Sequence, residues 1–407
     1  MALNTGGLMP IDEALDYILA QVSPAVGVEE LPLAQALGCV LAQAQVAQIN
    51  VPEHDNSAMD GFVLRCADLQ EGRRQLPISQ VIAAGHVGEP LEPGTAARIF
   101  TGAPIPAGAD TVVIQENAEF DENFVSILEQ PELGRNIRLK GHDIAKGGQV
   151  LDAGHRLRSQ DMGLLSSLGI SRIQVKRPLT IAIINTGDEI VPPDQVLKAG
   201  QIYDSNSYTL DALLQQLGFR TLKLGIVADD LESTEKALKA AASQADCVIT
   251  TGGVSVGDED HVRKAVENLG ELALWKLAIK PGKPFSFGRV SHKPFFGLPG
   301  NPVAVFVTFV MLVRPYLLKV QGAKEIALTE FKIKSGFDMP ETGSRQEYIR
   351  VKLHTNASGE QELLRFGNQG SSIMTSLSWA DGLAIIPIDT TVSKGKLLRY
   401  IPFAGLV

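Results

Sequence analysis

The pattern of apolar and polar positions changes twice along the chain. Near the N-terminus, apolar residues recur at helical spacing over 10–19, and a second short helix is expected over 33–40. Between residues 46 and 146 this pattern gives way to short apolar runs separated by Gly and Pro, which predict a β-rich domain. The expected strands of that domain lie at 77–83, 97–100, 111–115 and 124–128.

A third pattern occupies residues 179–320. It opens with a nearly unbroken apolar run over 179–184, as expected of a strand that is buried on both faces. Strand-like and helix-spaced segments then alternate, and the last helix is expected over 302–320. This alternation predicts right-handed crossovers and a parallel, doubly wound α/β sheet. The tail, 329–407, returns to short strands and turns, which predict a small β domain.

The chain therefore divides into four expected domains, and its fold class is a multidomain α/β and β protein. Helical patterns flank the β-rich stretch, over 10–19 and 156–168, and we expect these flanks to pack together, so that the β domain is an insertion. The expected domains are a linker domain of residues 1–45 and 147–176, an inserted β domain of residues 46–146, an α/β domain of residues 177–325, and a C-terminal β domain of residues 326–407.

Composition narrows the range of functions. The chain has 407 residues, and 37 Lys and Arg against 46 Asp and Glu give a net charge of −9, which argues against a protein that coats nucleic acid. Three cysteines are too few for a disulfide framework or a cysteine zinc site. The N-terminus shows no signal-peptide pattern, and the longest apolar stretch, 303–313, is too short for a bilayer. We expect a cytoplasmic protein that binds neither nucleic acid nor membrane.

Chemistry-bearing residues follow five of the predicted strands. In an open α/β sheet, ligands bind beyond the carboxyl ends of the strands. Here those ends carry carboxylates, glycines, lysines and the start of a helix, so their convergence predicts a ligand site at this edge. The segments are Thr186-Gly-Asp-Glu189, Asp229-Asp230, TTGGVSVGDED at 250–260, Lys280-Pro-Gly-Lys-Pro284 and GLPGNP at 297–302.

The acidic residues of these segments suggest a Mg²⁺ site, because Mg²⁺ usually takes one or two carboxylates together with substrate phosphates. Each of them alone could be an ordinary helix cap. We expect at least two to contact a metal or a substrate hydroxyl. Gly252 and Gly253 would let the backbone approach a phosphate closely, although the turn could also be purely structural. The carboxylates are Asp188, Glu189, Asp229, Asp230, Asp258 and Asp260.

Two lysines predict an anion pocket. Lys276 and Lys280 are an even number of residues apart, so on a single strand they would point to the same face. Two ammonium groups on one side of an apolar strand are costly without an anion, and Lys283 is close by. The alternative is a pair of solvated edge lysines. The helix start at Gly300-Asn301-Pro302 would add free backbone amides.

Seven segments, in order over nearly the whole chain, resemble the molybdopterin molybdenumtransferase family, which comprises MoeA-type proteins and the equivalent domain of gephyrin. Any one of them would be a weak signal, and their common order makes the resemblance strong. They are DNSAMDG at 55–61, TGAPIPAGAD at 101–110, TGDE at 186–189, YDSNSY at 203–208, TTGGVSVGDED at 250–260, KPGKP at 280–284 and GLPGNPVA at 297–304.

The resemblance implies the last step of molybdenum-cofactor synthesis. Adenylylated molybdopterin and molybdate would be bound with Mg²⁺, molybdenum would be inserted at the dithiolene, and AMP would be released. It also implies a homodimer of four-domain subunits, with a MogA-like α/β domain, a linker that takes part in dimerisation and a barrel-like C-terminal domain. The active site would lie between the α/β domain of one subunit and the inserted domain of the other. Molybdopterin adenylyltransferase and apo-molybdoenzymes are the implied protein partners.

The resemblance also assigns residues to roles. Ala304 departs from the serine of many relatives, and His142 from their glutamate, which bears on anion contacts. Arg345 is the implied molybdate partner in the tail, and Arg350 competes with it. The implied catalytic residues are Asp60, Thr101, Glu189, Asp229, Asp260, Lys276 and Lys280, of which Glu189, Asp229 and Asp260 would bind the metal. The implied substrate-binding residues are Thr251, Gly252, Gly253, Ser255, Lys283, Pro284, Pro299, Pro302 and Arg345.

Two alternatives remain at this point. Molybdopterin adenylyltransferase resembles residues 179–320 alone, and the DNSAMDG segment with the additional β domains argues against it. A non-catalytic scaffold, a role that the gephyrin domain also has, is disfavoured because the acidic and lysine residues are intact. Release of pyrophosphate from ATP would indicate the first alternative, and a stable membrane-receptor partner the second.

Overall fold

The computed structural model describes residues 7–23, 26–72, 74–253 and 261–406. By internal contacts the chain forms two compact units. Unit 1 comprises Met1–Ala42, Gly154–Arg158 and Ile173–Val407, and unit 2 comprises Gln43–Ala153 and Ser159–Arg172. The predicted four-domain boundaries stay a prediction.

Unit 1 is built around a six-stranded sheet. Its order is β16-β13-β17-β21-β20-β18, and the first four strands are parallel, as the sequence predicts. β20 is antiparallel to both of its neighbours, so the sheet is mixed. Ser291 and His292 both have positive φ, which makes the tight hairpin turn between β20 and β21. The strands are β13 (Thr180–Thr186), β16 (Arg220–Val227), β17 (Cys247–Thr251), β18 (Gly270–Lys276), β20 (Pro284–Val290) and β21 (Lys293–Leu298).

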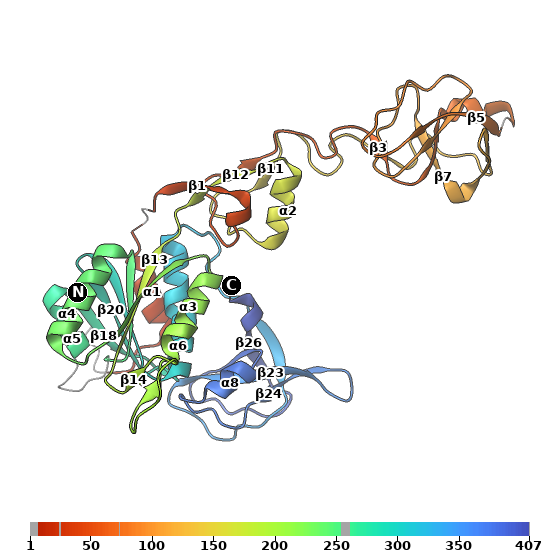
Figure 1. Cartoon of the computed structure of the whole chain (residues 1–407). Helices are drawn as coiled ribbons and strands as arrows, with labels where there is room; N and C mark the ends of the chain where they lie inside the picture. Colours follow the sequence, from red (N-terminus) through yellow and green to blue (C-terminus); the bar gives the residue numbers. More distant parts are fainter. Residues whose placement is uncertain (1–6, 24–25, 73, 254–260, 407) are drawn as a thin grey trace. The chain divides into compact units, whose positions relative to one another are not determined.

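Helices cover both faces of this sheet (Figure 1). On β13, Ile181 and Ile183 pack in one core with α1, α3 and the long helix, whereas Ala182 and Ile184 pack in the other with α4 and α5. Such alternation on a strand buried on both faces is the doubly wound arrangement that the sequence predicts. The helices are α1 (Ile11–Ala20), α3 (Asn206–Gln216), α4 (Leu231–Gln244), α5 (His261–Leu269), α6 (Pro302–Thr308) and α7 (Arg314–Val320).

The long helix over Pro302–Val320 consists of α6, a π-helical segment at Phe309–Val313, and α7. Its length and apolar composition would allow it to cross a membrane, but 83% of its most apolar window is buried inside the protein. It is the central helix of the larger core, which also receives side chains from the C-terminal strands, such as Leu383 and Ile401.

The C-terminal strands form a closed barrel, which confirms the barrel-like domain that the resemblance implies. The pairings β23–β24, β24–β22, β22–β26, β26–β25 and β25–β23 complete a ring, and β19 adds to β23 in parallel. A short helix, α8 (Met374–Trp379), precedes β25. The strands are β19 (Ile279–Lys280), β22 (Phe331–Ser335), β23 (Gln346–Thr355), β24 (Gln361–Arg365), β25 (Gly382–Ile386) and β26 (Leu397–Pro402).

Unit 2 contains a six-stranded sheet of order β7-β4-β6-β5-β9-β8. The four strands predicted in this region are confirmed, with small shifts at their ends. The unit also contains α2 (Ser159–Ser167) and the paired strands β2 (Gln45–Val46) and β11 (Gln149–Leu151). The sheet strands are β4 (Gly61–Leu64), β5 (Gln75–Ile82), β6 (Ala96–Ile99), β7 (Thr111–Ile114), β8 (Ala118–Phe120) and β9 (Phe124–Ile127).

One predicted helix is wrong. Residues 33–40 form only a 3-10 turn at Leu33–Gln35. Gly38 then takes a positive φ of 78°, and Val40 makes an isolated bridge with Arg156. A left-handed residue in this position ends any helix, because an L-residue helix cannot continue through it. The segment instead runs beside the returning chain, where β1 (Val28–Pro32) pairs with β12 (Arg172–Lys176).

Candidate functional site

Three parallel strands end side by side in unit 1 and bring their following loops together. Asn185 on β13 pairs with Thr251 on β17, which in turn pairs with Leu298 on β21. The loops border a cavity of about 530 Å³, which we call the strand-edge cavity. Its lining includes four of the residues implied by the resemblance, namely Glu189, Thr251, Gly252 and Pro302. The other lining residues are Thr186, Ile190, Ile202, Tyr203, Asp204, Ser205, Asn206, Gly300, Asn301, Ser372 and Met374.

The glycine turn after β17 requires glycine. Gly252 and Gly253 have φ values of +83° and +61°, and a Cβ on Gly253 would lie 2.4 Å from a methyl group of Val262. The Thr251 hydroxyl donates to Asn185 Oδ1 at 2.6 Å, so it is used within the protein. Thr251 and Gly252 therefore offer mainly their backbone to a ligand in the strand-edge cavity.

Asn206, at the start of α3, is a site residue that sequence reasoning missed. Its Nδ2 donates to the carbonyl of Gly300 at 2.8 Å, which fixes the orientation of the amide. The opposite atom, Oδ1, is buried and has no hydrogen-bond partner among the described residues. A buried unpaired acceptor is costly, and a ligand N–H or O–H would satisfy it. The YDSNSY segment contains Asn206, but nothing in its pattern distinguishes this residue.

The carboxylates at the same edge take different roles. Glu189 lines the strand-edge cavity, and its side chain lies over Gly187, where a Cβ would be 2.6 Å from Glu189 Oε2. The Asp188 carboxylate accepts from the backbone N–H of Asp229 at 3.2 Å and so joins the ends of β13 and β16. Asp230 caps α4 by accepting from the Ser233 N–H at 2.8 Å, and this bond lowers the pKa of Asp230. The helix-cap alternative is thus correct for Asp230.

A Mg²⁺ ion fits this carboxylate set only together with a ligand. Among the described residues, no group of three His, Cys, Asp or Glu side chains is placed to hold a metal. Glu189 at the cavity and Asp229, two residues after β16, would supply the hard oxygens that Mg²⁺ prefers, and substrate phosphates and water would complete its coordination. Asp258, Asp260 and Ser255 lie outside the described residues.

A second cavity, of about 320 Å³, adjoins the first and shares Gly300 and Asn301 with it. Three cations line it, Lys280, Lys283 and Arg345, and we call it the cationic cavity. Such a lining suits an oxyanion. The cavity also contains Pro284, Pro299 and Ala304, and it includes Gln369, Gly370 and Ser371, which sequence reasoning missed.

The prediction that Lys276 and Lys280 lie on one strand is wrong. Lys276 is the last residue of β18 in the α/β sheet, whereas Lys280 belongs to β19, which pairs with the barrel strand β23. The chain leaves one sheet and joins another between them, so the even spacing carries no information about a common face. Lys280 lines the cationic cavity, and Lys276 is exposed and lines neither of the two cavities.

The two arginines that compete for the predicted molybdate contact differ in burial and in their hydrogen bonds. Arg345 lines the cationic cavity and uses one N–H to bond the Ile279 carbonyl at 3.1 Å. Arg350 is only 1% exposed, and burial lowers its pKa to about 10. Its guanidinium donates to Ser376 Oγ at 3.0 Å and to the carbonyls of Gly370 at 3.0 Å and Tyr348 at 3.3 Å. Arg350 is therefore a structural residue of the barrel.

In unit 2, Asp60 and Thr101 form a hydrogen-bonded pair. Asp60 Oδ1 accepts from the Thr101 backbone N–H at 2.8 Å and from the Thr101 hydroxyl at 2.7 Å. These bonds lower the pKa of Asp60, with a smaller contribution from Arg98. The sequence places the two residues in separate motifs, and the pairing of β4 with β6 brings them together.

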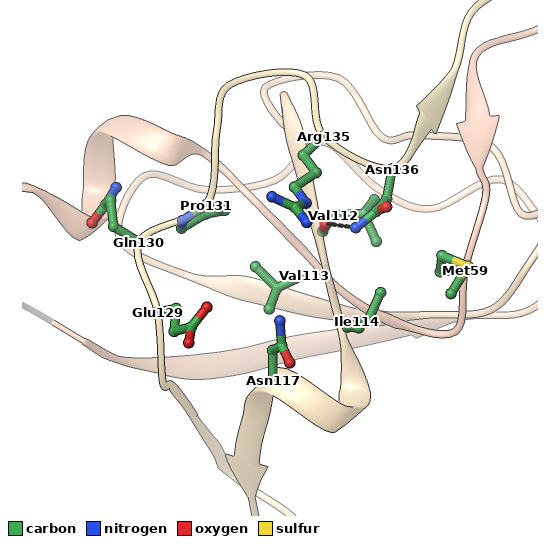
Figure 2. A pocket seen from close by; sticks show the side chains of 10 residues that line it. All are labelled: Met59, Val112, Val113, Ile114, Asn117, Glu129, Gln130, Pro131, Arg135 and Asn136. Atoms are coloured by element: carbon green, nitrogen blue, oxygen red, sulfur yellow. Dashed lines mark hydrogen bonds between the residues drawn. The ribbon is translucent and has the colours of Figure 1, made fainter.

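Unit 2 also contains a small pocket of about 120 Å³, whose lining includes Met59, Val113, Ile114, Glu129 and Arg135 (Figure 2). It contains none of the predicted site residues. The predicted site residues that the structure describes at a pocket or in a hydrogen-bonded pair are instead at the two cavities of unit 1 and in the Asp60–Thr101 pair.

Comparisons with known proteins agree with these features. Residues 9–169 match the MoeA N-terminal region, 182–319 match a probable molybdopterin binding domain, and 332–403 match the MoeA C-terminal region. The chain is 36% identical to the molybdopterin molybdenumtransferase of Haemophilus influenzae, over 98% of this chain and 100% of that one. It is 38% identical to the molybdopterin molybdenumtransferase of a Nostoc species, over 90% and 87% of the two chains.

Among solved structures, the molybdopterin biosynthesis MoeA protein from Pyrococcus horikoshii OT3 superimposes with a TM-score of 0.80. The two are 29% identical, and the alignment covers 98% of this chain and 100% of that one. The likeness thus extends over the inserted domain, the α/β domain and the barrel. The resemblance that the seven segments indicate is confirmed, and the chain belongs to the MoeA, or molybdopterin molybdenumtransferase, family.

Proposed function

We propose that this chain is a molybdopterin molybdenumtransferase, which combines molybdate with adenylylated molybdopterin, forms the molybdenum cofactor and releases AMP. The observation that carries the proposal is the pair of adjoining cavities, which share the lining residues Gly300 and Asn301. One offers a carboxylate, a glycine turn and an unpaired amide oxygen, and the other offers three cations. A large nucleotide-bearing substrate and a small oxyanion would then meet at their common wall.

The residues of unit 1 suit a mechanism of positioning and charge stabilisation. In the cationic cavity, Lys283 and Arg345 would hold the oxyanion, with Lys280 beside them, and keep it close to the dithiolene sulfurs. In the strand-edge cavity, the backbone at Gly252 would approach a phosphate, and Asn206 Oδ1 would orient a donor of the substrate. No covalent nucleophile is needed for these roles.

We propose Glu189, Asp229 and Asp260 as the metal ligands. Of these three residues, Glu189 lines the strand-edge cavity. When bound, Mg²⁺ would neutralise charge that develops on the departing AMP phosphate. The hydrogen bonds from Thr101 lower the pKa of Asp60, so its carboxylate would stay ionised at a lower pH than an ordinary aspartate. Its contact with substrate, the homodimer, the protein partners and the cytoplasmic location stay predictions.

Reconstitution tests this function. The purified full-length protein is incubated with adenylylated molybdopterin, Mg²⁺ and molybdate, while AMP release and activation of a cofactor-free molybdoenzyme are followed. Molybdate-dependent AMP release together with activation is the expected result. ATP consumption with pyrophosphate release would indicate the adenylyltransferase alternative instead. A folded protein that gives neither signal would indicate a scaffold.

A further inference from the structure

One carboxylate is paired with a cation of the cationic cavity. Glu347 Oε1 is 3.2 Å from Lys280 Nζ, and the Glu347 side chain is 15% exposed, compared with 51% for Lys280. Glu347 does not line the cavity itself. A carboxylate in this position opposes the binding of any anion, because like charges repel. Its pairing with one of the three cavity cations therefore calls for a functional explanation.

The fold fixes this carboxylate through a backbone ladder. β19 runs parallel to β23, with Ile279 opposite Gln346 and Lys280 opposite Glu347. Arg345 lies in the bend that immediately precedes β23, one residue before its first strand residue. The Arg345 guanidinium adds a bond to the Ile279 carbonyl at 3.1 Å. Lys280 and Glu347 are thus held opposite each other by two paired strands, and Arg345 is anchored to the same segment through the Ile279 carbonyl.

We propose that Glu347 sets the net charge of the cationic cavity and thereby its selectivity among tetrahedral oxyanions. This inference rests on the proposed function. Three cations less one carboxylate leave two positive charges, which equal the charge of a dianion such as molybdate. The Lys280 ammonium has three N–H donors, so it can bond Glu347 and still present donors to the oxyanion.

The proposal predicts a charge-dependent response. The Coulomb energy between a fixed charge and a ligand is proportional to the charge of the ligand. Removal of the Glu347 charge therefore changes the binding free energy of a dianion twice as much as that of a monoanion of the same shape. Molybdate and perrhenate are such a pair, since both are tetrahedral oxoanions of similar size, one a dianion and the other a monoanion.

Isothermal titration of the full-length protein with each anion tests this. Glu347→Gln keeps the size and an acceptor oxygen while it removes the charge, and we expect about tenfold tighter molybdate binding but only about threefold tighter perrhenate binding. Both gains should shrink as salt is added. Glu347→Asp retains the charge and should keep the wild-type preference between the two anions.

The matched control is Glu360→Gln, which removes the same charge from another ion pair of the barrel. In that pair Lys334 Nζ lies 2.9 Å from Glu360 Oε1, and neither residue lines the cationic cavity. It should leave both affinities unchanged. Equal gains for the two anions in Glu347→Gln, or no gain at all, would overturn the role of Glu347. Wild-type protein that binds neither anion would overturn the oxyanion assignment itself and this inference with it.

Discussion

Gly61, the last residue of the DNSAMDG segment, should not tolerate any side chain. A Cβ added to it would lie 1.9 Å from the carbonyl oxygen of Val113 on the neighbouring strand β7, which is much shorter than any contact that Cβ atoms make with other heavy atoms in proteins. In Gly61→Ala the two strands must separate by about 1 Å or more, which disrupts their ladder at the end nearest Asp60. The loss of hydrogen bonds between β4 and β7, together with poorer packing of the buried Phe62, should lower the free energy of unfolding of unit 2 by about 3–5 kcal/mol.

Hydrogen exchange measured by mass spectrometry checks this prediction segment by segment. Peptides that cover β4 and β7 should lose protection, while peptides of the α/β sheet and barrel keep theirs, and molybdate binding should persist although AMP release falls. Gly163→Ala is the control, because Gly163 lies in α2 of the same unit with nothing within 4 Å of its Cβ position. That change should be neutral or slightly stabilising, since Ala favours helix. Wild-type protection of β4 in Gly61→Ala would refute the steric reasoning.

Two further predictions concern residues of the candidate site. Arg345→Gln should weaken molybdate binding at unchanged thermal stability. Arg350→Met should lower the melting temperature by several degrees, because it removes the three hydrogen bonds of a buried guanidinium. Calorimetry with anion titration checks both, and the opposite pattern would reverse the roles of the two arginines. Thr101→Val should raise the pKa of Asp60 by removing its hydroxyl donor, so that the Asp60 carboxylate is lost at higher pH as the solution is acidified. The acid limb of AMP release should then move to higher pH, and an unchanged limb would show that Asp60 ionisation does not control the reaction.

The parts of the fold that were predictable have local causes. The strand over 179–184 can be predicted because a doubly buried strand must be apolar throughout, and the helix over 302–320 because its apolar residues fill the main core. The hairpin between β20 and β21 was not predictable. Its turn is Ser291-His292, and neither residue is one of the Gly or Asn residues that usually signal such a turn.

The candidate site was predictable where it depends on strand ends and unpredictable where it depends on distant pairing. Glu189 and Gly252 follow buried strands directly, so the rule for open sheets locates them. Ser371 reaches the cationic cavity only because the barrel brings its loop there, and no local pattern shows this. The spacing of Lys276 and Lys280 was misleading for the same reason, because β19 pairs with a strand far away in sequence.

The parallel pairing of β19 with β23 has a thermodynamic consequence. The cationic cavity takes Lys280 and Lys283 from the segment that leaves the α/β sheet, and Arg345 and Ser371 from the barrel. An anion bound there is a cross-link between two parts of one polypeptide. Because a ligand that binds only the folded protein adds to its stability, occupancy of the cavity raises the cooperativity with which sheet and barrel unfold. A bound oxyanion would then stabilise the folded enzyme until the reaction consumes it.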